Sequence, residues 1–100
     1  MAKLYIHYQQ PADKEGFEEY YFKTHAPLAQ KVPNIRGSKV HQVVQNQNTD
    51  LKLYMIIEID FDDLNTLQQA LATPEWNAVA QDAQNLQKYL NEPPFIVITK

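Results

Sequence analysis

The chain of 100 residues contains no cysteine and only two glycines, Gly16 and Gly37. The lack of cysteine excludes disulfide bonds, thiolate metal ligands and a cysteine nucleophile. Two isolated glycines cannot form a glycine-rich loop whose backbone amides bind phosphate, so nucleotide-dependent chemistry is not expected. The protein must rely on an ordinary hydrophobic core, and its length suits one domain that spans residues 1–100.

The sequence also lacks an excess of positive charge and a long apolar segment. Nine basic residues stand against twelve acidic ones, so neither nucleic acid nor an anionic membrane is an expected partner. No segment approaches the roughly 20 apolar residues of a membrane span, and the N-terminus lacks the apolar run of a signal peptide. We therefore expect a cytoplasmic protein whose partners are small neutral or apolar molecules.

Four segments have the alternation and composition of β-strands, at residues 3–8, 38–45, 51–61 and 95–99. In the third strand, every second residue from Leu51 to Phe61 is apolar. The other faces of the first and third strands are mixed and carry Lys3, Tyr5, His7, Lys52, Tyr54, Ile56, Glu58 and Asp60.

Helices are predicted after the first and third strands. Asp13 is the expected N-cap of the first helix, and Pro27 must kink or restart this helix close to His25, because proline lacks an amide proton and its ring collides with an earlier carbonyl. Asp62 or Asp63 caps a short helix. A final helix starts at Thr73-Pro74-Glu75, and its inward stripe is predicted to be Trp76, Val79, Ala80, Ala83, Gln87 and Leu90.

The resulting order βαββαβ favours a ferredoxin-like α+β fold, in which a four-stranded antiparallel sheet carries its helices on one face. The other face is partly apolar, so it needs a partner, and a second copy packed sheet to sheet would form a homodimer that closes or nearly closes a barrel. We expect Tyr5, His7, Tyr54 and Glu58 to face the space between sheet and partner, with residues near His25 at its mouth.

His25 is the best candidate for chemistry, because imidazole changes charge near neutral pH and can move a proton. The alternative is that its ring caps the helix break by bonding a carbonyl that Pro27 leaves free. Glu58 is either a base whose pKa is raised by desolvation or one half of a dimer salt bridge. Tyr21 either touches a ligand or is simply core. No metal site is expected, since the three histidines come from separate elements.

Two stretches match a known family. Residues 17–29, FEEYYFKTHAPLA, and residues 73–83, TPEWNAVAQDA, resemble the signature stretches of the EthD family. The resemblance implies a dimeric α+β barrel related to muconolactone isomerases, small antibiotic-pathway monooxygenases and haem-degrading enzymes, and it assigns the family histidine to His25. Asn34 and Trp76 depart from the residues common in the family, glycine and a small residue, and Trp76 would reshape the pocket.

Together these observations predict an EthD-like homodimer that binds a small apolar or aromatic metabolite in a cavity between its sheet and helices. The first hypothesis is a cofactor-free isomerase or monooxygenase with His25 as acid or base. The alternatives are a non-catalytic module that sequesters a hydrophobic metabolite, and a protein that binds or degrades haem. The candidate ligand-binding residues are Tyr5, His7, Tyr21, Tyr54, Glu58 and Trp76.

Overall fold

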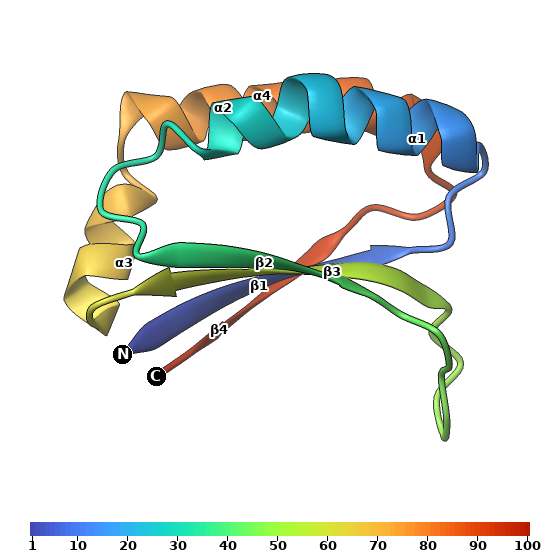
Figure 1. Ribbon diagram of the computed structural model, residues 1–100, viewed down its shortest axis with the longest axis horizontal. Helices are drawn as coiled ribbons and strands as arrows, with labels where there is room; N and C mark the ends of the chain where they lie inside the picture. The colour runs from blue at the N-terminus through green and yellow to red at the C-terminus, as the bar shows by residue number, and fades with distance from the viewer.

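A four-stranded antiparallel sheet is covered on one face by helices in the computed structural model, which describes residues 1–100 (Figure 1). This arrangement confirms the predicted order βαββαβ. In chain order the elements are β1 (Ala2–Gln9), α1 (Lys14–Tyr20), the π-helical turn η1 (Tyr21–His25), α2 (Ala26–Ala29), β2 (Gly37–Gln42), β3 (Leu53–Phe61), α3 (Leu64–Ala70), α4 (Pro74–Leu86), the 3-10 turn η2 (Gln87–Tyr89) and β4 (Phe95–Thr99).

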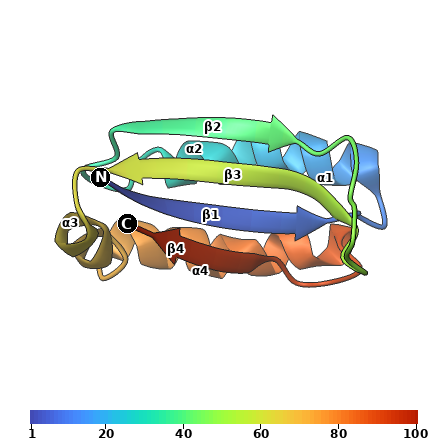
Figure 2. The ribbon, with the colours of Figure 1, turned by 90° about the horizontal axis from the view of Figure 1, so that it is seen from below.

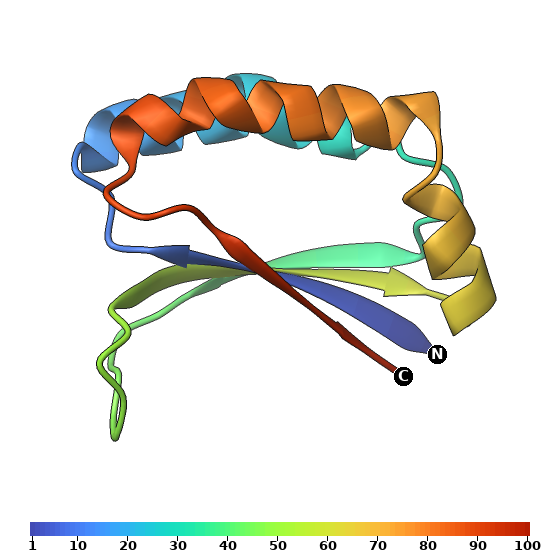
Figure 3. The same ribbon diagram turned by 180° about the vertical axis from the view of Figure 1, so that it is seen from behind.

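The strands lie in the order β2-β3-β1-β4, and every neighbouring pair is antiparallel. Seen from the uncovered face, α1 and α2 lie behind β2 and β3, whereas α4 lies behind β4 (Figure 2). From behind, α4 runs the length of the sheet above β4 (Figure 3). None of the helices is long and apolar enough to cross a lipid bilayer.

The core lies between the sheet and the helices, because alternate residues of the two central strands point to that side. Three strands differ from the prediction at their ends: β1 is one residue longer at each end, β2 begins at Gly37 and ends at Gln42, and β3 begins at Leu53, with Leu51 exposed outside it. The largest fully buried side chains are those of Tyr8, Phe17, Phe61, Leu4, Met55, Leu67 and Leu86.

The helix starts follow the predicted caps. The carboxylate of Asp13 accepts from the amide of Gly16, and that of Asp63 accepts from the amide of Thr66. The hydroxyl of Thr73 accepts from the amide of Trp76 in the same way, so each cap satisfies a free amide of the first helical turn.

The predicted break near His25 is a π-helical turn inside one continuous rod formed by α1, η1 and α2 (Figure 1). The amide of Ala26 donates to the carbonyl of Tyr21, five residues earlier, where an α-helix would use a spacing of four. The wider turn immediately precedes Pro27, whose ring cannot be accommodated against an ordinary α-helical turn. The chain thus passes the proline without ending the helix.

Candidate functional site

The side chain of His25 points from the π-helical turn to the neighbouring helix α4. Its Nδ1 lies 2.9 Å from Oδ2 of Asp82, and the residue is 3% exposed. The ring of Tyr21 packs against the imidazole at a centroid distance of 5.6 Å. The alternative that His25 caps a carbonyl freed by Pro27 is therefore wrong, because its partner is a carboxylate on another helix.

Asp82 collects hydrogen bonds from three side chains. Besides His25, the hydroxyl of Tyr20 donates to Oδ1 at 2.5 Å, and Nδ2 of Asn85 donates to Oδ1 at 3.1 Å. Burial alone would raise the pKa of Asp82, but these donors outweigh it and lower the pKa below its ordinary value. An ionised carboxylate only accepts, so Nδ1 of His25 donates and Nε2 is left as the nitrogen that can accept a proton.

An apolar pocket of about 250 Å³ lies beside His25, where α4 faces β1 and β4. Seven of its nine lining residues are hydrophobic, so the imidazole meets a largely apolar space. Trp76, predicted to bind ligand, lines this pocket, whereas Tyr21 does not. The lining residues are Ile6, Tyr8, His25, Trp76, Val79, Ala80, Ala83, Pro94 and Ile96.

Tyr21 lines a second, smaller pocket of about 100 Å³, which lies between the first helical rod and strands β2 and β3. Its ring is 4% exposed and packs edge-on against Tyr8 at 5.8 Å. Tyr21 is thus a core residue that also borders a cavity, and it belongs to a different cavity from that of His25.

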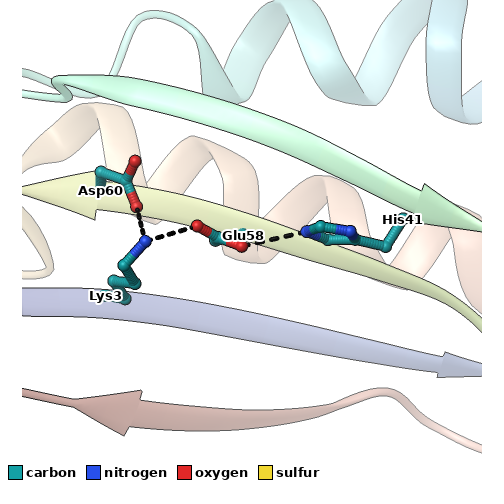
Figure 4. Close-up of polar contacts among 4 residues, drawn as sticks. All are labelled: Lys3, His41, Glu58 and Asp60. Carbon is teal, nitrogen blue, oxygen red and sulfur yellow. Dashed lines mark hydrogen bonds and ion pairs between the residues drawn. The ribbon is translucent and has the colours of Figure 1, made fainter.

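The predicted residue Glu58 lies on the uncovered face of the sheet, in a row of charged side chains (Figure 4). Nζ of Lys3 donates to Glu58 at 2.6 Å and contacts Asp60 at 3.1 Å, and Nε2 of His41 lies 3.0 Å from Glu58. The Lys3 hydrogen bond, followed by that of His41, lowers the pKa of Glu58 to about 2. A base with a raised pKa is therefore wrong here, because neighbouring cations outweigh the cost of burial.

Tyr5 and His7 also lie on the uncovered face, as predicted. The imidazole of His7 stacks on the ring of Phe95, with centroids 4.6 Å apart, and its Nδ1 is buried without a hydrogen-bonding partner. Tyr5 packs next to His7 at a centroid distance of 6.4 Å. The sheet therefore separates Tyr5, His7 and Glu58 from His25, so the expected single cavity does not form within one chain.

The prediction that Tyr54 lies on the uncovered face is wrong, because its side chain points to the helix-covered side of the sheet. The register shifts between Tyr8, which pairs with Met55, and Gln9, which pairs with Leu53, so Tyr54 is the unpaired residue of a β-bulge. Its hydroxyl donates to Glu18 of α1 at 2.6 Å, and its ring meets Phe17 edge-on. Tyr54 thus fastens α1 to the sheet.

Sequence reasoning missed Asp82, the residue that orients His25. The signal was present, because Asp82 follows the buried Val79 by three positions and precedes the buried Leu86 by four, which places an acid on the inward stripe. The predicted stripe instead included Ala80 and Gln87, which are exposed. Elsewhere in the chain, no three histidine or carboxylate side chains gather into a group that could hold a metal ion.

The EthD domain model matches residues 9–87, a span that includes both His25 and Asp82. The chain belongs to the EthD family. An EthD family protein of Bacillus halodurans, known from its crystal structure, is 39% identical and has a TM-score of 0.85, with 100% of this chain and 97% of that one covered. An uncharacterized 11.0 kDa protein from the thcB-thcC intergenic region of Rhodococcus erythropolis is 28% identical over 85 residues, which cover 85% of this chain and 82% of the relative.

A more distant likeness bears on the fold alone. A dimeric protein of unknown function with a ferredoxin-like fold, from Bacteroides fragilis, is 17% identical with a TM-score of 0.64, and the match covers 99% of this chain and 94% of that one. This likeness confirms the ferredoxin-like α+β architecture of this EthD protein, whose sheet has the strand order β2-β3-β1-β4.

Proposed function

We propose that this EthD protein binds a small apolar or aromatic compound in the pocket beside His25, and that His25 moves a proton to or from that compound without a cofactor. The observation that carries the proposal is the hydrogen bond from Nδ1 of the buried His25 to Asp82, at the edge of an apolar pocket. Asp82 fixes the orientation of the ring and stabilises the imidazolium that forms when Nε2 accepts a proton.

The apolar lining suits this chemistry in two ways. It binds an apolar compound by removing it from water, and it strengthens the electrostatic contact between the imidazolium and Asp82, because little water screens that contact. Isomerisation of a lactone and oxygenation of an electron-rich ring both begin with loss of a proton from an acidic C–H or O–H group. An isomerase or a monooxygenase that uses His25 as its base is therefore the expected enzyme.

The proposed assembly is a homodimer in which the uncovered sheet faces of two subunits pack against each other. That face has an apolar area beside the row of charged side chains, and the strand register places Tyr5, Ile56, Phe95 and Val97 on it. An apolar area of this kind is unusual on a surface exposed to water. Two-fold packing of identical faces would cover it. The description of the Bacteroides fragilis protein of the same fold as dimeric supports this assembly.

A turnover and binding panel tests the role of His25. The parent protein, His25→Ala, Asp82→Asn and Lys23→Ala would be incubated with unsaturated lactones and with hydroquinones, and product would be measured by chromatography. We expect His25→Ala to lower kcat by about 10²- to 10⁴-fold, the usual contribution of a general base. Lys23→Ala changes an exposed side chain of the same turn and serves as the control.

The same panel contains the result that would reject the proposal. If His25→Ala turns over a substrate of the parent at the parent's rate, His25 is not the acid or base. A compound that raises Tm of the parent but is recovered unchanged would instead identify a binding protein without catalysis.

A further inference from the structure

We propose that Tyr8 is a second catalytic residue of this pocket, and that its hydroxyl donates a hydrogen bond to the oxygen of a small carbonyl compound while His25 removes a proton from the adjacent carbon. This role depends on the proposed function of His25 and adds a substrate class to it. The substrate is a compound whose C–H bond is made acidic by a neighbouring carbonyl group.

The first observation is a deeply placed hydroxyl that has no partner. Tyr8, on β1, is 2% exposed and lines the pocket of His25, but its hydroxyl makes no hydrogen bond within the chain. Only two sealed polar side-chain atoms lack a hydrogen bond, His7 Nδ1 and Asp60 Oδ1, and the second of these forms an ion pair with Lys3. The Tyr8 hydroxyl is not one of them, so it keeps some accessible surface, and the pocket beside His25 is the space that Tyr8 lines. Buried polar groups normally find partners, so this hydroxyl has a place for one in the pocket.

The second observation is that the Tyr8 hydroxyl and Nε2 of His25, two of the polar groups of the pocket, have complementary roles. Burial, together with the nearby Tyr21, raises the pKa of Tyr8, so its hydroxyl keeps its proton and acts as a donor. Nε2 of His25 acts as the acceptor, because Nδ1 already donates to Asp82. A compound that presents both an acceptor oxygen and an acidic hydrogen satisfies both groups, and a carbonyl with a neighbouring C–H bond has this combination.

The size of the pocket limits the compound to a small one. Its volume of about 250 Å³ lies just below the range of about 300–1,000 Å³ that holds drug-sized ligands, so a compound with a single ring is expected. Tyr21 is almost equally buried but lines the other pocket, which is why the assignment falls on Tyr8.

The proposed step conserves atoms and electrons. Nε2 of His25 takes the proton from the carbon beside the carbonyl, and the C–H electron pair becomes the carbon–carbon double bond of an enolate. The carbonyl π pair moves onto the oxygen, where the Tyr8 hydroxyl stabilises the charge and keeps its own proton. The imidazolium then returns the proton to the same carbon or, in an unsaturated compound, to the far end of the conjugated system, which moves the double bond. No oxidant or other reactant is consumed.

Proton exchange in heavy water tests this step directly. The probes are α-angelica lactone and cyclopentanone, and deuterium incorporation beside the carbonyl is followed by proton NMR. We expect Tyr8→Phe to lower kcat for exchange by about 10²- to 10³-fold, the cost of losing one oxyanion donor, with little change in KM. His25→Gln should abolish exchange. Tyr89→Phe, which removes an unbonded hydroxyl outside the pocket, should match the parent.

Three contrary results separate the two proposals. Exchange by Tyr8→Phe at the parent's rate, with His25→Gln inactive, would remove Tyr8 and keep His25. Parent protein that does not exceed the buffer rate with either probe would reject the carbonyl class, and the turnover panel would still decide the role of His25. A second experiment compares the affinity of the parent and of Tyr8→Phe for para-nitrophenol, whose oxygen mimics that of the enolate. The variant should bind it at least tenfold more weakly, and equal affinity would contradict the role of Tyr8.

Discussion

On the helix-covered face of the sheet, apolar side chains surround two groups that each keep a polar atom unpaired, the Tyr8 hydroxyl and Nε2 of His25. On the uncovered face, Glu58 contacts both Lys3 and His41 (Figure 4), and Nδ1 of His7 is the buried atom that lacks a polar contact. Unpaired polar atoms inside an apolar pocket suit a small ligand, whereas mutually paired charges among apolar residues suit a protein surface. The proposed chemistry therefore belongs to the covered face of the sheet, and the proposed dimer contact belongs to the uncovered face.

The largest expected effect comes from the covered face. Phe17→Ala removes a ring that is completely buried against Tyr8 and Tyr54, and we expect it to lower the free energy of unfolding by about 3–5 kcal/mol. Phe22→Ala, at a ring that is 45% exposed, is the matched control and should cost much less. Urea unfolding measures both, and equal losses would contradict the placement of the core.

A charge on the uncovered face should break the proposed dimer. Val97 lies opposite Tyr5 on that face, so Val97→Lys should weaken self-association by at least about 30-fold, the effect of a hot spot of about 2 kcal/mol. Ile98→Lys changes the next residue of the same strand, which points to the other face and is similarly exposed, and it should leave the dimer intact. Sedimentation equilibrium distinguishes them, and a monomeric parent would reject the assembly.

Acid should lower the stability of the fold by protonating Glu58 on the uncovered face. Its pKa is lowered to about 2 in the folded protein from an ordinary value of 4.5, so its ionised form stabilises the fold above pH 4.5, and that contribution is lost as the pH falls towards 2. Glu58→Gln should flatten the dependence of stability on pH in this window. Glu19→Gln, at an exposed carboxylate, should retain the slope of the parent in urea titrations at fixed protein concentration.

The smallest expected effect is a change in stability that tests on which face of the sheet the Tyr54 side chain lies. Tyr54→Phe removes the hydrogen bond to Glu18 and should lower the free energy of unfolding by about 1 kcal/mol while leaving self-association unchanged. A double-mutant cycle with Glu18→Gln should show coupling between the two residues. Weaker self-association of Tyr54→Phe without coupling to Glu18 would return Tyr54 to the uncovered face.

Local patterns were sufficient for the elements of the fold. Alternation in β3 and the caps Asp13, Thr73 and Asp63 depend on neighbouring residues in the chain, so the sequence displays them directly. The bulge at Tyr54 is different, because it arises from the register between β3 and β1, which no local pattern contains. The side chain of Tyr54 therefore lies on the other face from the predicted one, although the strand was predicted except for its first two residues.

The candidate site was predicted only in part, for a topological reason. The helical segment α1–η1–α2, which carries His25, and helix α4 cover the same face of the sheet. Tyr5 and His7 lie on the opposite face, so His25 cannot share a cavity with them within one chain. The lowered pKa of Glu58 depends on Lys3, a cross-strand neighbour that is 55 positions away in the sequence. The catalytic role of His25 stays a prediction. The same holds for the ligand-binding roles of Tyr5, His7, Tyr21, Tyr54, Glu58 and Trp76.

The length of the π-helical turn matters to the proline that follows it. The hydrogen bond from Ala26 to Tyr21 spans one residue more than an α-helical turn, so deleting one residue between them would let this segment close as an ordinary α-helical turn with α1 and α2 still in phase. Phe17 and His25 would keep their directions, but the ring of Pro27 would then meet the carbonyl of a regular α-helical turn. One additional residue in the turn therefore lets this helix contain a proline without a change in the direction of its buried side chains.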